Sequence, residues 1–181
     1  GNRQRLVRVL GGWAGNPATT PVILKAADVY KSTDLFAIAP YFYADQNSLM
    51  QANSVDDIFS LVNGNQTYSV KQTLRLIDQH MMLLEPYGVS LGAYEGGQHL
   101  VHYGTKSKKD HPNPILIEAN RDPRMETAYI ELLDGFRKAG GKLFMAFSSP
   151  RANAFYGCWG IKEYITQPST ETPKFRALTR F

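Results

Sequence analysis

The sequence predicts an α/β fold built on a parallel sheet. Short apolar runs alternate with amphipathic helical segments along the 181 residues, a pattern typical of α/β proteins. The apolar runs are continuous, which indicates strands buried on both faces, as in parallel sheets covered by helices. Hydrophobic residues make up 43% of the chain and charged residues 20%, enough for one domain with a hydrophobic core. Two architectures fit this pattern: an open doubly wound sheet and part of a (β/α) barrel.

The predicted strands and helices follow one another in order. Strands are predicted at residues 6–10, 35–39, 89–94 and 143–147. The first helix is predicted at residues 21–30, with Thr20 as its N-cap and a proline at its first position. Further helices are predicted to begin at Ser54, Ser69 and Asp122, and a last one covers residues 172–181. Apolar residues three and four apart in these segments have the helical period.

Several classes of function are not expected. The net charge of +4 comes from scattered basic residues, and the one dense group, at residues 106–109, is expected to be a solvated face, so no nucleic-acid partner is predicted. The segment from Gly11 to Gly15 lacks the glycine spacing of a dinucleotide fold. One cysteine and four histidines without ligand spacing predict no metal centre, and no cofactor is expected. No run approaches the roughly 20 apolar residues of a membrane span.

Residues that can bind or react gather directly after the predicted strands. They are Trp13 after the first strand, Tyr41 and Tyr43 after the second, Glu95, Gln98 and His99 after the third, and Trp159 after the fourth. Active sites of α/β barrels form where the carboxyl ends of the strands meet. Sugars present apolar ring faces to aromatic side chains and hydroxyl groups to amides and imidazoles. One carboxylate among such residues therefore indicates a carbohydrate cleft.

Each of these residues also has a structural interpretation. Glu95 is equally consistent with a solvated loop carboxylate, and a lone histidine such as His99 is more often structural than catalytic. The two tyrosines are consistent with packing at a barrel rim, and Trp159 with a core position. Among the other chemically capable residues, Tyr129 and Cys158 are expected in the core.

Three motifs resemble a known family. They are Ala39-Pro40-Tyr41-Phe42, Ala93-Tyr94-Glu95-Gly96-Gly97-Gln98-His99 and Tyr156-Gly157-Cys158-Trp159-Gly160. They resemble the C-terminal half of the retaining glycoside hydrolases of the large (β/α)8-barrel clan, clan A, and the ending from Thr172 to Leu178 resembles the last helix of such enzymes. The resemblance implies half of a (β/α)8 barrel, with barrel strands five to eight running from residues 6–10 to residues 143–147. The whole chain, residues 1–181, would then be the C-terminal half of a catalytic barrel.

The resemblance also implies roles for individual residues. The clan's nucleophile is a glutamate at the end of strand seven, which is Glu95 here. A tyrosine after strand six commonly hydrogen-bonds the nucleophile, and Tyr41 is the better match, with Tyr43 second. A tryptophan after strand eight commonly forms the floor of the sugar site, and Trp159 matches it. Gln98 and His99 have no role shared across the clan and are expected to line the cleft, as is Trp13.

The second carboxyl group of the reaction is missing from the motifs. Retaining hydrolysis needs two carboxyl groups about 5–5.5 Å apart, one as nucleophile and one as acid and base. The clan supplies the acid and base from a glutamate after strand four, usually preceded by asparagine, and this chain contains no Asn-Glu pair. Glu118 is a weaker candidate for that role.

Because a complete barrel has eight strands and about 250 residues, we expect a partner. The expected partner is a complementary N-terminal half-barrel, as a separate chain or segment, or a second copy of this chain. The expected function is hydrolysis of a β-linked glycan. The alternative is a carbohydrate-binding or assembly module without turnover, or an α/β domain of unrelated function. The clan's tendency to export predicts a secreted or periplasmic location.

Overall fold

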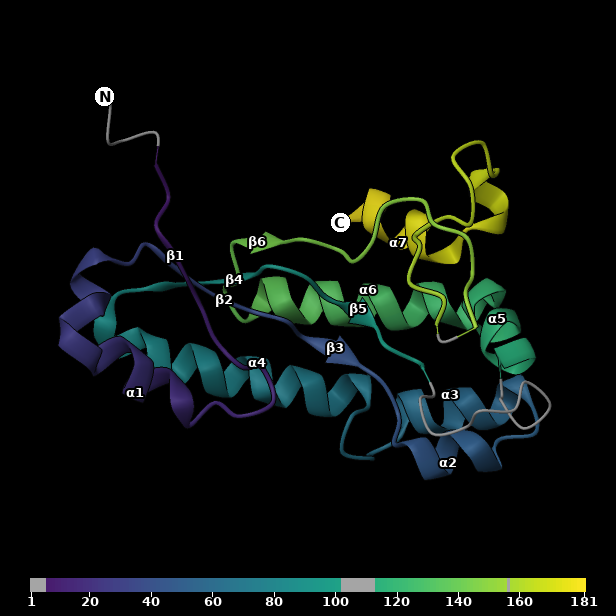
Figure 1. Cartoon of the computed structure of the whole chain (residues 1–181), viewed down its shortest axis with the longest axis horizontal. Helices are drawn as coiled ribbons and strands as arrows, with labels where there is room; N and C mark the ends of the chain where they lie inside the picture. Colours follow the sequence, from purple (N-terminus) through teal and green to yellow (C-terminus); the bar gives the residue numbers. More distant parts are fainter. Residues whose placement is uncertain (1–5, 102–112, 156) are drawn as a thin grey trace. The chain divides into compact units, whose positions relative to one another are not determined.

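The computed structural model describes residues 6–101, 113–155 and 157–181 (Figure 1). The chain forms two compact units. The first, here called the sheet unit, comprises Gly1–Pro40, Leu74–Gly96 and Gly135–Met145. The second, here called the helical unit, comprises Tyr41–Thr73, Gly97–Asp134 and Ala146–Phe181.

The sheet unit contains four parallel strands. They are β1 (Val9–Gly11), β2 (Leu35–Ile38), β4 (Ser90–Ala93) and β6 (Leu143–Phe144). The order across the sheet is β1-β2-β4-β6, so the strands lie side by side in the order of the sequence (Figure 1). The predicted α/β fold with four parallel strands is therefore confirmed. The last strand is shorter than predicted, because its pairing with β4 ends at Phe144.

The central strands carry the core of this unit. Every residue of β2 is buried, and Leu91, Gly92 and Ala93 of β4 are buried as well. Strands with helices or loops on both faces need apolar side chains at every position, which is why the sequence is continuously apolar there. Phe36 of β2 lies near His80, with ring centroids 6.3 Å apart.

The first helix differs from its prediction. Helix α1 covers Thr19–Lys25 and continues as a 3₁₀ segment, η2, over Ala26–Ser32. Ala18 occupies the N-cap and makes no side-chain bond, so the prediction of Thr20 as N-cap is wrong. Thr20 is fully buried, and its hydroxyl is 2.9 Å from Nδ1 of His80. The hydroxyl therefore joins α1 to helix α4 (Val70–Leu84), which ends in the 3₁₀ turn η3 (Glu85–Tyr87).

His80 is a buried histidine bonded through both ring nitrogens. Its Nε2 is 3.1 Å from the carbonyl oxygen of Ala14, which only a protonated Nε2 can satisfy, so Nδ1 accepts from the Thr20 hydroxyl. Burial lowers the pKa of His80, with the Ala14 carbonyl opposing the shift. The ring is therefore neutral near neutral pH and is held by one donor and one acceptor.

The buried, neutral His80 predicts that the free energy of unfolding falls in mild acid. Below the unfolded-state pKa of 6.5, the unfolded chain binds a proton at His80 that the folded chain does not. The free energy of unfolding is therefore expected to fall by up to about 1.4 kcal/mol for each pH unit below that value. Urea unfolding of wild type and His80→Gln at pH 7.5 and pH 5.0 measures this. The wild type should lose more stability than the variant, and equal losses would rule the explanation out.

The outer strands of the sheet expose apolar side chains. Val9 of β1 is 56% exposed, and Leu143 of β6 and Met145 just after it are 52% and 55% exposed. β1 and β6 each pair with one neighbour, because they are the ends of the strand order. Open edges with apolar side chains are the surfaces on which further strands pair.

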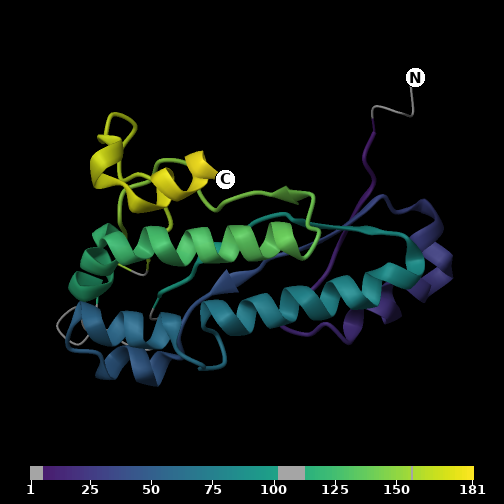
Figure 2. The same cartoon turned by 180° about the vertical axis from the view of Figure 1, so that it is seen from behind.

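The helical unit is arranged around a small parallel sheet. Strand β3 (Tyr41–Phe42) pairs with β5 (Gly97–Gln98). The helices of this unit are α2 (Gln46–Gln51), α3 (Val55–Asn63), α5 (Asn113–Arg121), most of α6 (Pro123–Lys138) and α7 (Pro173–Arg180), with a 3₁₀ turn η4 (Ser169–Glu171). Figure 2 shows α2 and α3 side by side, as does Figure 1.

Most helices of this unit were predictable. Helix α3 follows Ser54, as predicted, and Ser54 caps it in a capping box with Asp57. The predicted last helix is α7, which begins at Pro173, one residue after the predicted start. Gly140 has φ 98° after the end of α6, the backbone conformation that favours glycine. Helices α2 and α5 and the small sheet were not predicted, because each is short and lacks a long amphipathic repeat.

Tyr129 of α6 is the centre of the helical unit's core. Its ring is fully buried and lies 5.7 Å from that of Phe42, edge to face. Its hydroxyl oxygen accepts the backbone N–H of Gln98 at 3.0 Å. Gly97 has φ 131°, and a Cβ there would lie 2.5 Å from the Tyr129 hydroxyl oxygen, so only glycine fits. The Tyr129 hydroxyl thus holds the backbone of β5 from the side of the core.

Within the described residues, no helix is long and apolar enough to cross a membrane. The basic group at residues 106–109 lies outside the described residues.

Candidate functional site

The helical unit brings together four of the seven predicted site residues. Their rings, with that of Phe147, form a cluster here called the aromatic cluster: Tyr41, Tyr43, His99, Phe147 and Trp159. His99 is at the middle, with ring centroids 5.2 Å from Tyr41, 6.2 Å from Tyr43 and 5.7 Å from Trp159. Phe147 closes the cluster at 6.4 Å from both Tyr41 and Trp159. All five side chains are partly exposed.

Strand alternation explains why these rings meet. The register of the small sheet places Tyr41 opposite Gly97 and Phe42 opposite Gln98, and the His99 N–H donates to the Phe42 carbonyl oxygen at 2.8 Å. Successive side chains of a strand point to opposite faces. Phe42 and Gln98 therefore enter the core, where both are fully buried. Tyr41, Tyr43 and His99 share the other, partly exposed face.

Trp159 is held by a ladder between two stretches of the loop after β6. The Ser148 N–H donates to the Trp159 carbonyl oxygen at 3.0 Å, and the Ile161 N–H donates to the Ser148 carbonyl oxygen at 3.0 Å. The Arg151 N–H donates to the Lys162 carbonyl oxygen at 2.9 Å. The Arg151 guanidinium also lies 5.3 Å from the centroid of the Trp159 ring, a cation–π contact. The indole is thus fixed from its backbone and contacted by a cation.

Tyr43 keeps its proton over the whole physiological range. Its ring stacks on that of Tyr68 with centroids 4.0 Å apart. Burial, followed by the neighbouring Tyr68, raises the pKa of Tyr43 to about 12. A phenol with this pKa stays protonated at neutral pH, and a side-chain hydrogen bond with Tyr68 contributes to the shift.

Gln98 supports the cluster from the core. Its Nε2 donates to the Cys158 carbonyl oxygen at 2.7 Å, and its Oε1 accepts the Leu100 N–H at 2.8 Å. Gln98 precedes His99 and Cys158 precedes Trp159, so this one bond ties together the backbones that carry two of the rings. The sequence predicts Gln98 as a cleft residue; the structure places its amide in the protein interior, bonded to backbone.

The other two predicted residues belong to the sheet unit. Glu95 follows β4 by two residues and is partly exposed, and Tyr94 beside it is exposed. A Cβ on the next residue, Gly96, would lie 2.7 Å from the Phe144 ring, so the chain after Glu95 runs close against β6. Trp13 follows β1 and is 67% exposed. Glu118, the weaker carboxyl candidate, lies exposed on α5 of the helical unit.

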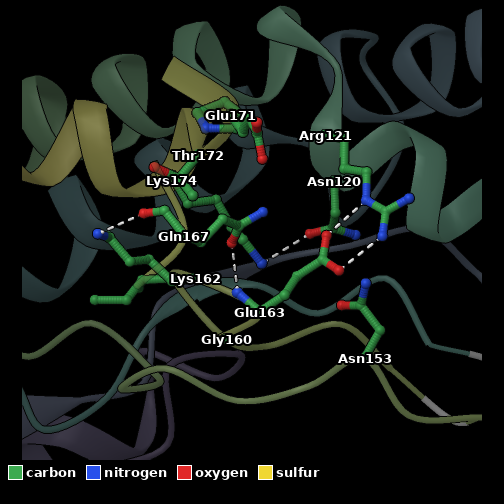
Figure 3. Close-up of a pocket in the computed structure, with 12 residues that line it drawn as sticks. Asn120, Arg121, Asn153, Gly160, Lys162, Glu163, Gln167, Glu171, Thr172 and Lys174 are labelled. Carbon is green, nitrogen blue, oxygen red and sulfur yellow. Dashed lines mark hydrogen bonds and ion pairs between the residues drawn. The ribbon is translucent and has the colours of Figure 1, made fainter. Parts of the chain in front are cut away.

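A polar pocket lies beside the loop that carries Trp159. Figure 3 shows it between α5, that loop and the start of α7. Arg121 makes two bonds to the Glu163 carboxylate, at 2.6 and 2.7 Å, and the Glu163 N–H donates to the Gln167 side-chain oxygen at 2.7 Å. Lys174 reaches Asn120 Oδ1 at 3.0 Å (Figure 3).

The cations of this pocket bond to protein groups: Arg121 to the Glu163 carboxylate, and Lys162 and Lys174 to carbonyl oxygens. Among the buried side-chain oxygen and nitrogen atoms that the structure describes, Glu126 Oε1 alone lacks a hydrogen bond, and it is ion-paired with Arg180 at 2.9 Å. The pocket is therefore a structural network that supports the loop, and the aromatic cluster is the better candidate for ligand binding.

Two residues at the cluster were not predicted: Phe147, which belongs to it, and Tyr68, which stacks on Tyr43. Phe147 is predicted as the end of the fourth strand, but the strand stops three residues earlier and frees its ring for the cluster. Tyr68 lies in a turn before α4, and its only signal is a tyrosine in a polar stretch.

Within the described ranges, no group of three or more histidine, cysteine, aspartate or glutamate residues could hold a metal ion. No family model, curated protein or solved structure matches this chain.

Proposed function

We propose that this chain is the C-terminal half of a (β/α)8-barrel glycoside hydrolase that cleaves a β-linked glycan with retention. The family resemblance makes Glu95 the proposed nucleophile. The aromatic cluster of the helical unit is, by itself, the proposed sugar-binding surface. The observation that carries the proposal is the aromatic cluster itself. Rings from three separate segments lie close together there: those of Tyr41 and Tyr43, of His99 and of Trp159.

The strand order supports the barrel. In a barrel, consecutive parallel strands are neighbours all the way round. A doubly wound sheet instead reverses its strand order at a switch point. The order β1-β2-β4-β6 runs in one direction without reversal. The assignment of these strands to barrel positions five to eight follows from the resemblance.

The side chains of the cluster suit a sugar. Partly exposed rings such as Trp159 and Tyr41 offer apolar faces for the C–H groups of a pyranose. Phenol and imidazole groups are also of the kind that hydrogen-bonds to sugar hydroxyls. Tyrosine and tryptophan have an apolar ring and one polar group, and such side chains are enriched at binding interfaces.

Glu95 supplies the nucleophile in this proposal. Its carboxylate attacks the anomeric carbon, the bond to the leaving-group oxygen breaks, and a covalent glycosyl-enzyme forms. The acid that protonates the leaving oxygen is a glutamate of the N-terminal half-barrel. The same glutamate then deprotonates the water that releases the sugar.

The complementary half-barrel is the partner that the sheet edges suit. Closing a barrel requires a strand beside β1 and another beside β6. Those are the strands that carry exposed Val9 and Leu143. Pairing with a half-barrel would cover both edges at once, whether the partner is a separate chain, another segment or a second copy.

Trp159→Ala is expected to lower glycan affinity at least tenfold, because it removes the largest ring of the cluster. Loss of the stacking area costs more than about 1.4 kcal/mol, which is a factor of ten in the dissociation constant. Isothermal titration with β-1,4-linked hexasaccharides of glucose, mannose and xylose measures this.

Tyr164→Ala is the matched control, because Tyr164 is an exposed aromatic residue on the same loop outside the cluster. It should bind as the wild type does. The same titration of Trp13→Ala measures whether Trp13, the remaining predicted aromatic residue, contributes to glycan affinity. If Trp159→Ala and Tyr164→Ala bind a hexasaccharide equally well, the cluster is not the sugar site.

A further inference from the structure

Lys174 is an unusual cation in the helical unit. It lies on the first turn of α7, and only 4% of its surface is exposed. Its ammonium group donates to two neutral oxygens, the Cys158 carbonyl at 2.5 Å and Asn120 Oδ1 at 3.0 Å. Burying an ammonium ion without a bonded carboxylate is costly, and an apolar side chain of similar length would avoid that cost.

The location of this cation connects it to the aromatic cluster. The Cys158 carbonyl oxygen accepts from Lys174 on one side and from Gln98 on the other. The peptide group that contains this oxygen leads directly into Trp159. Two buried donors from α7 and β5 therefore converge on the backbone that sets the position of the indole.

We propose that Lys174 is a positioning residue of the aromatic cluster, whose ammonium group holds the Cys158 carbonyl oxygen and thereby fixes Trp159 in a protonation-dependent way. The neutral amine has two hydrogens in place of three, and its bonds are no longer charge-assisted. Deprotonation therefore loosens the backbone before Trp159. The consequence for glycan affinity rests on the proposed function, whereas the position of the indole does not.

The groups around Lys174 set the pH at which its ammonium group loses a proton. Burial lowers the pKa of Lys174 to about 8 from its ordinary 10.5, with the Glu163 carboxylate opposing the shift. Glu163 is paired with Arg121, and the other charged groups that line the pocket are Lys162 and Glu171. Burial raises the pKa of the Cys158 thiol to about 11, so this thiol stays neutral while Lys174 titrates. The transition is therefore expected near pH 8.

Tryptophan fluorescence tests this without any ligand. The chain has two tryptophans, so in a Trp13→Phe background the emission reports Trp159 alone. We expect a change of emission with a midpoint near pH 8 between pH 6.5 and 9.5. Lys174→Met should abolish it, and Lys174→Arg, which stays charged, should keep the low-pH emission throughout. Lys162→Met is the matched control from the same pocket and should retain the transition.

The stability of the same proteins gives a second readout. The folded chain releases the Lys174 proton at lower pH than the unfolded chain does. The free energy of unfolding of the wild type relative to Lys174→Met should therefore rise between pH 8 and pH 10. No emission change near pH 8 in the Trp13→Phe protein, or the same change in Lys174→Met, would overturn the proposal, even if the chain binds glycans. An intact fluorescence transition with no glycan binding would leave it standing and reject the proposed function instead.

Discussion

Glu95→Gln is expected to abolish glycoside hydrolysis while leaving glycan affinity within about twofold of the wild type. The amide is nearly the same size as the carboxylate but cannot attack the anomeric carbon. Turnover should fall by roughly 10⁴-fold or more, the scale of removing an attacking nucleophile. The measurement is release of reducing sugar by the chain together with its complementary half-barrel, alongside isothermal titration of the same β-linked hexasaccharides.

Glu85→Gln is the matched control for this experiment. Glu85 is an exposed carboxylate at the end of α4 in the same unit, and its loss should change neither turnover nor affinity. If Glu95→Gln hydrolyses the glycan as fast as the wild type does, Glu95 is not the nucleophile. If neither the wild type nor Glu95→Gln hydrolyses the glycan but both bind it, the chain is a carbohydrate-binding module.

Gln98→Met is expected to have the second largest effect, on both stability and binding. The substitution keeps the length of a fully buried side chain but leaves the Leu100 N–H without its acceptor and takes one donor from the Cys158 carbonyl. An unsatisfied buried backbone group costs about 1–3 kcal/mol, so the free energy of unfolding should fall by about 2–4 kcal/mol. Urea unfolding followed by far-UV circular dichroism measures the loss.

The same substitution should also weaken glycan binding, because the bond to Cys158 joins the backbones of His99 and Trp159. Gln79→Met, on the exposed face of α4, removes the same side-chain amide where it is solvated. This control should be within about 0.5 kcal/mol of the wild type. A Gln98→Met protein as stable as that control would show that the buried amide does not hold the cluster together.

The sequence was most informative about the strands and the rings. Four apolar runs marked the four strands of the parallel sheet, because a strand buried on both faces leaves no room for polar side chains. Aromatic residues after these runs marked the cluster. Tyr41, Tyr43, His99 and Trp159 were predicted together because each follows an apolar run, and their rings lie close together in the structure.

Long-range partners were not predictable from local pattern. Thr20 has every local property of an N-cap, yet its hydroxyl bonds to His80, sixty residues away. Gln98 reads as a cleft residue from its neighbours, and only the parallel register of β3 and β5 shows that it turns into the core. Lys174 reads as an ordinary basic residue of an amphipathic helix. Its burial depends on the loop that folds over α7, which no local pattern specifies.

The most direct test of the proposed function is to trap the covalent intermediate. A 2-deoxy-2-fluoro glycoside with a dinitrophenyl leaving group needs no acid to protonate that group, so the chain is expected to react without its complementary half. Intact mass after incubation with the gluco, manno and xylo compounds should show addition of one fluorosugar, on the peptide that contains Glu95. The Glu95→Gln protein should remain unmodified. A wild-type chain that binds the hexasaccharides but gains no mass, or gains it on another residue, would contradict the assignment of Glu95 as the nucleophile.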